Sequence, residues 1–501
     1  MNNRNKTGDV KKIKNKTNKR SAKSLATNFL ALAVILVLTD ASETYAVERE
    51  GGISVGGYGS VRYEYLTQGN KSISTFTLRR IVPTFSATVK ERLRFYTELE
   101  FERFGLLELV EELTPYQGGL RAKTEIEGTH GSEIKLEQMW GEFEIARALR
   151  FRVGGILPPV GRFNILHDDD IWEPARRPLS VRDATVLPDK TAWMEIGAGF
   201  NGNFDLGETL LGYEAYVLNG VTLEHDFELY VIGGHERKID DTTTVKYNQA
   251  KLEAVIKPRF GNARLDTKKE KALAGRIFVA PALGYELGFS GYFGRYTPSF
   301  LVPANLWTAA IDFKAEPISA FDFEGEYAFT QFTKLSTVIQ DIISKSFHKT
   351  GTTIFYQSST GTAVIVPTGI VSEIKVKELS LADTKQGGWV LFRFKFFPSF
   401  LQGTVFDFDG ESQFILFDRP EYVSYKNTIV ALDFKDGNIT REQKADISQF
   451  RNTVGIAYRP VKTFVFSISY EFTTLLSGPR YIHTSGNENQ HAILFGFAFG
   501  L

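Results

Sequence analysis

The feature that most constrains the fold is an alternation of large apolar and charged side chains that recurs along the chain. In residues 92–102, Leu and Phe alternate with the charged residues Arg92, Arg94, Glu98, Glu100 and Glu102. The same period returns in residues 321–329, with Asp322, Glu324 and Glu326, and in residues 391–397, with Arg393 and Lys395. Successive side chains of a strand point to opposite faces, and a barrel strand crosses a membrane in about 9–11 residues. We therefore predict an all-β transmembrane antiparallel barrel, with these charged residues lining its lumen.

The C-terminus carries the same pattern to its last residue. Every second position is large and apolar, namely Ile493, Phe495, Phe497, Phe499 and Leu501. A chain that ends inside a strand suits a barrel whose last strand closes on the first, because closure leaves no free sheet edge. The pattern also resembles the C-terminal recognition signal of bacterial outer-membrane proteins. We therefore expect Phe495, Phe497, Phe499 and Leu501 to direct assembly by the barrel-assembly machinery.

Seventeen runs qualify as candidate strands. They cover residues 52–66, 74–89, 91–104, 134–146, 149–157, 191–204, 208–219, 249–260, 274–282, 284–295, 305–315, 319–332, 387–397, 411–425, 449–459, 462–474 and 490–501. Single-chain outer-membrane barrels have even strand numbers, so we predict about 16 strands, with 18 the next choice. The run at 134–146 alternates least well. The polar insertions at 220–248, 333–386 and 433–448 are predicted to be extracellular loops, where added length is tolerated.

The N-terminus has the anatomy of a secretory signal peptide. Residues 1–24 hold nine Lys or Arg and one acid, ten apolar residues follow at 29–38, and Thr44-Tyr45-Ala46 offers small residues for cleavage. Ten apolar residues are too few to cross about 30 Å of hydrocarbon. We expect residues 1–46 to be removed, leaving residues 47–501 as one barrel domain with six more acids than bases. That charge argues against a nucleic-acid partner.

A segment rich in proline and charge interrupts the strand pattern. It contains Gly-x-x-x-x-Pro at 154–159, Gly-x-x-Asn-x-x-His at 161–167, Arg177-Pro178, Pro-x-x-x-x-Trp at 188–193 and Glu-x-Gly-x-Gly at 195–199. With Gly56-Gly57-Tyr58-Gly59 and the strands near the C-terminus, these motifs resemble the porin family that includes the phosphate-selective porins O and P. The resemblance covers most of residues 52–220 and 385–501. No arginine ladder like that of the phosphate-selective members is assignable in this sequence. The resemblance therefore does not indicate selectivity for phosphate.

The resemblance implies a water-filled homotrimer in outer-membrane lipid, with an infolded loop that narrows each pore near residues 158–190. Opposite charges at such a constriction select solutes by charge. The candidate constriction residues are Arg162, Asp168, Asp169, Asp170, Arg176, Arg177, Arg182 and Asp183. The alternative is that these charges only solvate an exposed loop.

Other chemistry finds little support in the sequence. The chain has no Cys, which excludes disulfides and cysteine-ligated zinc. The run from His167 to Asp170 offers ligands for a hard cation, but four successive residues rarely converge on one ion, so we predict no metal and no cofactor. The chain has no Gly-x-Ser-x-Gly elbow, and we expect no enzymatic activity, although a site assembled in space would escape this search.

The predicted function is therefore passive diffusion of small hydrophilic solutes or ions across a bacterial outer membrane. Two alternatives remain open. One is a barrel that acts as a sheath or scaffold for a partner, such as an electron-transfer protein, or binds ligands at the cell surface. The other is an outer-membrane enzyme.

Overall fold

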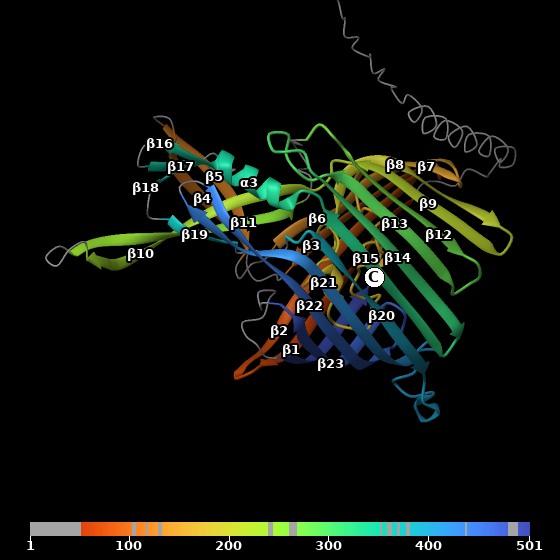
Figure 1. Ribbon diagram of the computed structural model, residues 1–501. Helices are drawn as coiled ribbons and strands as arrows, with labels where there is room; N and C mark the ends of the chain where they lie inside the picture. The colour runs from red at the N-terminus through yellow and green to blue at the C-terminus, as the bar shows by residue number, and fades with distance from the viewer. Residues whose placement is uncertain are drawn as a thin grey trace, which may run out of the picture.

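The computed structural model describes residues 52–501 except 103–106, 117–118, 129–132, 239–243, 260–267, 351–352, 358–362, 368–370, 377–380, 436–437 and 479–488. Sixteen strands form one closed antiparallel barrel (Figure 1). In order around the barrel they are β1 (Gly52–Gln68), β2 (Lys71–Val89), β3 (Leu93–Glu102), β6 (Glu133–Ala146), β7 (Leu149–Ile156), β8 (Glu195–Leu206), β9 (Thr209–Leu218), β12 (Ala272–Ala280), β13 (Glu286–Arg295), β14 (Asn305–Ile318), β15 (Phe321–Phe332), β20 (Thr384–Phe396), β21 (Gln413–Lys435), β22 (Asn438–Arg459), β23 (Phe464–Ser477) and β24 (Gln490–Gly500).

The last strand closes the barrel on the first. β24 pairs antiparallel with β1 from Tyr58 opposite Gly500 to Gln68 opposite Gln490, and β1 pairs along its other edge with β2. The last strand is thus paired on both sides, and the sheet of the barrel wall is closed, which removes the edges that an open sheet would present. The prediction of a porin-like barrel with 16 strands is confirmed.

Sixteen of the seventeen sequence runs correspond to barrel strands, including the weakly alternating run at 134–146, which lies in β6. The run at 249–260 was wrongly predicted to be a barrel strand. It lies in β11 (Thr244–Arg259), which pairs with β10 (Thr222–Lys238) and with β19 (Val371–Val376). An alternating run indicates a strand with two different faces, but it does not specify which sheet the strand joins.

The predicted loops contain more regular structure than expected. Residues 220–248 include β10, and residues 333–386 include α3 (Leu335–Ser346), β16 (Phe347–Thr350), β17 (Thr353–Gln357), β18 (Ala363–Pro367) and β19. Residues 433–448 were wrongly predicted to be a loop, because β21 and β22 pair as far as Lys435 and Asn438. A further hairpin, β4 (Leu107–Tyr116) and β5 (Gly119–Gly128), lies between β3 and β6. Figure 1 shows these additions together beyond one end of the barrel.

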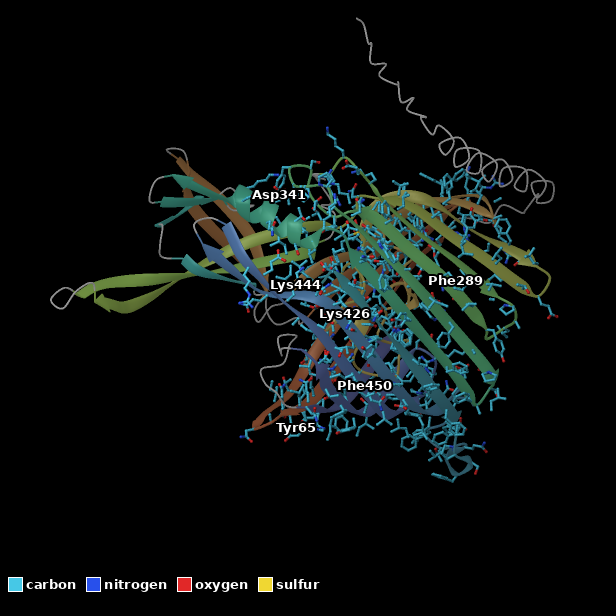
Figure 2. The ribbon with its side chains drawn as sticks, viewed as in Figure 1. Tyr65, Phe289, Asp341, Lys426, Lys444 and Phe450 are labelled. Carbon is cyan, nitrogen blue, oxygen red and sulfur yellow. The ribbon has the colours of Figure 1, made fainter. Side chains whose placement is uncertain are left out.

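The two faces of the barrel wall differ as the alternation predicts. Large apolar side chains are exposed on the outside, among them Phe85, Phe95, Phe151, Phe200, Phe289, Phe293, Phe392, Phe394, Phe466 and Phe495. Figure 2 labels Phe289 on β13. Charged side chains on the inner face are buried, for example Glu98, Asp322 and Arg393. No helix within the described ranges is long and apolar enough to cross a membrane.

Candidate functional site: the barrel lumen

The segment between β7 and β8, residues 157–194, lies inside the barrel; we call it the lumen loop. It contains only the short helices α2 (Arg162–Ile165) and η2 (Leu179–Val181). Its aromatic residues pack against the barrel wall: the ring of Trp172 lies 4.8 Å from that of Phe163 and 5.4 Å from that of Trp389 on β20. Trp193 is fully buried and contacts Tyr292 of β13, with ring centroids 5.0 Å apart. The lumen loop therefore forms a packed core within the barrel.

The backbone at the start of the lumen loop explains why it leaves the sheet. Pro158 and Pro159 lack the amide hydrogens that a continuing strand needs, and the chain turns inward there. Gly161 has a φ of 75°, and a Cβ at this position would lie 2.7 Å from the carboxyl group of Glu326. That carboxylate accepts a hydrogen bond of 2.9 Å from the backbone amide of Phe163. A glycine is therefore required where the loop backbone meets β15.

Ion pairs fasten the middle of the lumen loop to β20–β23. Glu173 is buried and accepts hydrogen bonds from Arg393, at 2.5 Å, and from Arg459, at 3.1 Å. Burial alone would raise the pKa of Glu173, but the two guanidinium groups outweigh that effect and lower the pKa to about 2. Arg176 pairs with Glu471 of β23 at 3.1 Å and with Glu64 of β1. These buried charges all have opposite partners, as burial requires.

Further ion pairs hold the loop to the other sides of the barrel. Asp169 lies 3.1 Å from Arg80 of β2 and accepts a hydrogen bond of 2.6 Å from Ser60 of β1. Arg162 donates to Glu324 of β15 and Glu286 of β13, both at 2.8 Å. The lumen loop is thus tied to the wall on opposite sides.

The structure places all eight predicted constriction residues in the lumen, and most of them are paired. Arg177 lies 3.6 Å from Asp169, and Arg182 lies 3.3 Å from Glu102. Asp183 pairs with Arg451 at 2.7 Å, and the backbone carbonyl of Asp170 accepts a hydrogen bond from Arg459. The side chain of Asp168 is 37% exposed. Most of these charges are therefore engaged in holding the loop.

The predicted lumen-lining residues fall into three groups. Glu98, Glu100, Glu102, Asp322, Glu324, Glu326 and Arg393 are buried on the inner face of the wall. Arg94 and Lys395 are partly exposed and pair with acids, Arg94 with Glu144 and Lys395 with Asp322. Arg92 is exposed in the turn before β3, because β3 begins only at Leu93. Arg92 therefore lies at the barrel end, whereas the prediction had placed it within the lumen.

A polar cavity of about 280 Å³ lies between the lumen loop and the wall formed by β6–β9 and β12. Its lining residues are Gln138, Arg150, Arg152, Leu157, Ile165, Asn201, Asn203, Tyr213, Glu214 and Phe278. Arg152 pairs with Glu142 at 2.8 Å and stacks over the ring of Trp140 at 4.2 Å. No ion pair joins Arg150 to a carboxylate within the described part of the chain. The sequence analysis did not name Arg150 and Arg152 as lumen residues, although their alternation with Phe151 indicates a strand with a charged inner face.

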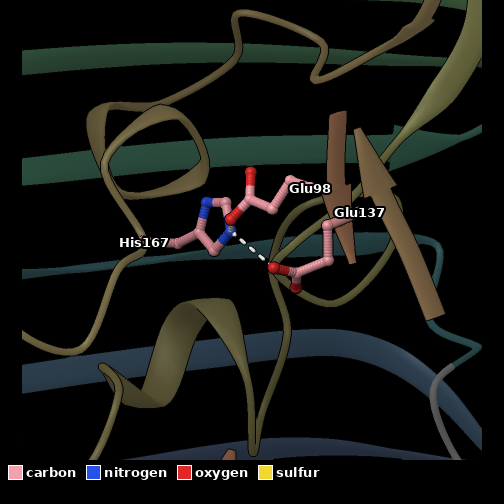
Figure 3. A group of neighbouring side chains, drawn as sticks. All are labelled: Glu98, Glu137 and His167. Atoms are coloured by element: carbon pink, nitrogen blue, oxygen red, sulfur yellow. Dashed lines mark hydrogen bonds and ion pairs between the residues drawn. The ribbon is translucent and has the colours of Figure 1, made fainter. Parts of the chain in front are cut away.

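One group of side chains in the lumen has the composition of a metal centre. Glu98 on β3, Glu137 on β6 and His167 of the lumen loop bring one ligand atom each within 4.8 Å of one another (Figure 3). Burial alone would lower the pKa of His167, but the Glu137 carboxylate at 3.3 Å outweighs it and raises the pKa to about 10. Sequence spacing could not reveal this group, since its members are 30 or more positions apart.

The fold and its surfaces define a class of protein. The chain has an apolar outer face, a charged inner face and strands paired around the whole barrel, and such closed pairing is how a sheet satisfies its backbone polar groups in hydrocarbon. Only helices and closed barrels do so, and this even-numbered antiparallel barrel has the architecture of bacterial outer-membrane proteins. The chain is therefore a transmembrane barrel of the bacterial outer membrane.

Comparisons with known proteins add the following similarities. No family model matches the chain. Over 184 residues, or 37% of this chain, it is 29% identical to an uncharacterized protein of Aquifex aeolicus (strain VF5), and the match spans only 35% of that protein's length.

Among solved structures, the chain is similar to an anion-selective porin from Comamonas acidovorans, with 7% identity and a TM-score of 0.45 over 90% of this chain and 100% of that one. It is also similar to Salmonella typhi OmpF in complex with daunomycin, with 9% identity and a TM-score of 0.43 over 90% and 97% of the two chains. A third similar structure is the outer-membrane channel DcaP of Acinetobacter baumannii, with 9% identity and a TM-score of 0.41 over 91% and 99%.

Proposed function

We propose that the chain is a porin through which small hydrophilic solutes or ions diffuse passively. The observation that carries this proposal is the polar cavity beside the lumen loop. Around this cavity the wall of β6–β9 faces the loop with glutamine, arginine, asparagine, tyrosine and glutamate side chains. An aqueous path along this wall explains why these polar groups lie inside the barrel.

The charges of this wall are mixed in sign. The cavity is lined by Arg150, Arg152 and Glu214, and Arg152 also pairs with Glu142, so two positive charges face two negative ones. A pathway lined by charges of both signs admits small ions of either sign. The constriction residues predicted from the sequence then act mainly by holding the loop in position. Phosphate is one solute to test, because the sequence resembles a porin family that has phosphate-selective members.

The proposal is tested by single-channel recording from the refolded mature chain in a planar bilayer. Discrete conductance steps are expected, and the reversal potential in a salt gradient measures the preference between anions and cations. The substitution Arg152→Glu should shift that potential toward cations. Arg147→Glu serves as the control, because Arg147 is an exposed arginine in the turn before β7. A silent channel from folded, heat-modifiable protein would refute the pore function.

We further propose that residues 1–46, which lie outside the described residues, are removed on export, and that Phe495, Phe497, Phe499 and Leu501 form the signal read by the barrel-assembly machinery. We propose that the assembled barrel is a homotrimer. N-terminal sequencing of the membrane protein should begin at Val47. Native mass spectrometry of the detergent-extracted protein should give three copies.

A second candidate function is that of a scaffold or surface-binding barrel. The extent of the packed lumen loop favours it, because residues such as Val160, Val186 and Trp193 are fully buried inside the barrel. A barrel of this kind would be silent in the bilayer and would purify with a bound partner.

A further inference from the structure

We propose that Glu98, Glu137 and His167 form a binding site for a divalent transition-metal ion of the Zn²⁺ class, which fastens the lumen loop to β3 and β6. The three residues come from three separate elements, and their side chains point toward one another (Figure 3). All three are buried, with exposures of 1% or less. The inference is independent of whether the barrel conducts solutes.

The distances fit tetrahedral coordination. With metal–ligand bonds of about 2.0–2.1 Å, the ligand atoms of a tetrahedral site lie about 3.3 Å apart. His167 Nε2 lies 3.3 Å from Glu137 Oε2 and 3.9 Å from Glu98 Oε1. Asp168 Oδ1 lies 3.8 Å from the same nitrogen, and this partly exposed carboxylate offers a fourth ligand. Small side-chain adjustments would therefore bring the set to bonding distance.

Neighbouring hydrogen bonds orient the ligands. His167 Nδ1 lies 3.2 Å from the backbone carbonyl of Asn164. A hydrogen on Nδ1 donated to this carbonyl leaves the lone pair of Nε2 directed at the two carboxylates, the arrangement common in histidine metal ligands. Glu98 Oε2 accepts a hydrogen bond of 2.7 Å from Gln138. Glu98 Oε1, the oxygen nearer His167, is buried and accepts no hydrogen bond from the described residues.

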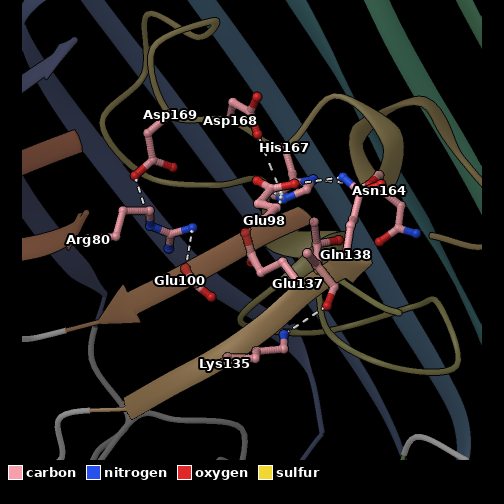
Figure 4. Close-up of polar contacts among 12 residues, drawn as sticks. Arg80, Glu98, Glu100, Lys135, Glu137, Gln138, Asn164, His167, Asp168 and Asp169 are labelled. Carbon is pink, nitrogen blue, oxygen red and sulfur yellow. Dashed lines mark hydrogen bonds and ion pairs between the residues drawn. The ribbon is translucent and has the colours of Figure 1, made fainter. Parts of the chain in front are cut away.

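The local charge also calls for a cation. Glu98, Glu100, Glu137 and Asp168 bring four carboxylates to this part of the lumen (Figure 4). The nearby Arg80 is already shared, since it lies 2.9 Å from Glu100, 2.9 Å from Glu102 and 3.1 Å from Asp169. Lys135, the second cation near Glu137, donates a hydrogen bond of 2.9 Å to the backbone carbonyl of Ala192. A buried carboxylate without a compensating charge is costly. A bound dication would neutralise Glu98 and Glu137 together.

The ligand types select the class of metal. An imidazole nitrogen suits Zn²⁺ and its transition-metal neighbours, whereas Ca²⁺ and Mg²⁺ prefer sites made only of oxygen, with six or more ligands or retained waters. The competing explanation is a protonated His167 that forms an ion pair with Glu137. In that case the group would take up no metal.

The test uses the refolded mature chain, stripped of metal with a chelator. After incubation with ZnCl₂ and gel filtration, one zinc per chain should remain, and excess Ca²⁺ or Mg²⁺ should not displace it. X-ray absorption at the zinc edge should show nitrogen and oxygen ligands at about 2.0–2.2 Å, including imidazole scattering. No retained zinc, or zinc without an imidazole ligand, would overturn the proposal.

Substitutions locate the site. His167→Gln and Glu137→Gln should each weaken zinc binding by at least about 100-fold, because loss of an outer-shell partner alone costs about 10–100-fold. Glu144→Gln is the matched control, since Glu144 lies on β6 but pairs with Arg94 near the barrel end. Zinc binding at wild-type strength by the folded variants would place the metal elsewhere and refute the assignment. If a variant fails to fold, the X-ray absorption spectrum of the unmodified chain tests whether His167 binds the zinc.

Discussion

Glu173 is the residue whose loss should most directly loosen the lumen loop. The substitution Glu173→Gln keeps the side-chain shape but removes the charge that faces Arg393 and Arg459. Breaking a buried ion pair by removing one partner costs about 3–5 kcal/mol. We expect the lower end, about 3 kcal/mol, because Arg393 keeps Asp322 and Glu324 as partners. At about 1.4 kcal/mol for each factor of ten, this corresponds to opening of the loop about 100-fold more often.

Hydrogen exchange followed by mass spectrometry measures this opening. Peptides from residues 157–194 should exchange about 100-fold faster in the Glu173→Gln variant, while peptides from β13 and β14 keep their wild-type rates. The matched control is Glu316→Gln, which removes a carboxylate that pairs with Lys395 near the barrel end and does not contact the lumen loop. Loop exchange within threefold of the wild-type rate would refute the view that this ion pair secures the loop.

Three further predictions follow from the geometry. Phe289→Arg should lower the free energy of unfolding by about 2–4 kcal/mol, the cost of an arginine facing lipid near the bilayer centre. Leu283→Arg, in the fully exposed turn before β13, should lower it by less than about 1 kcal/mol. Urea unfolding in lipid vesicles measures both values. Gly161→Ala should destabilise the folded barrel by about 1–3 kcal/mol more than Gly207→Ala. Both glycines have positive φ, but only the new methyl group at 161 meets another residue. Equal losses of stability in thermal unfolding would contradict this. The pKa of Glu173 is lowered from 4.5 to about 2 in the folded protein, so its charge should stabilise the lumen loop fully above about pH 4.5 and lose this effect as the pH falls toward 2. Protection of the lumen loop from hydrogen exchange should therefore fall between about pH 4.5 and about pH 2. This fall should be smaller in the Glu173→Gln variant.

The barrel could be predicted from the sequence because its determinants are local. Alternation over about 10 residues is imposed by lipid on one side and the lumen on the other, so a run such as 319–332 indicates a membrane strand without knowledge of its neighbours. The wrong predictions concern segments outside the membrane, where lipid no longer imposes the alternation. β11 alternates beyond the barrel, and β21 and β22 continue as a paired hairpin where polar composition indicated a loop.

The site was less predictable because its contacts join distant parts of the chain. The charges of the lumen loop were visible in the sequence, but their partners were not: Glu173 pairs with Arg393, 220 positions later, and Arg177 provides the carbonyl that accepts from Arg451, 274 positions later. The grouping of His167 with Glu98 and Glu137 likewise depends on how β3, β6 and the loop meet. A single sequence holds no signal for such distances.

The long separations also fix an order of events in assembly. The lumen loop belongs to the first half of the chain, but Arg393, Arg451 and Arg459, which hold it, belong to the last five strands. Because entropy must be lost in closing these long loops before their contacts form, the loop cannot reach its final position until β20–β23 have joined the sheet. The interior of this barrel is therefore completed last, at about the time that β24 meets β1. In an assembly intermediate trapped before closure, protease should cleave the lumen loop. Protection of the loop from protease should therefore indicate that the barrel has closed.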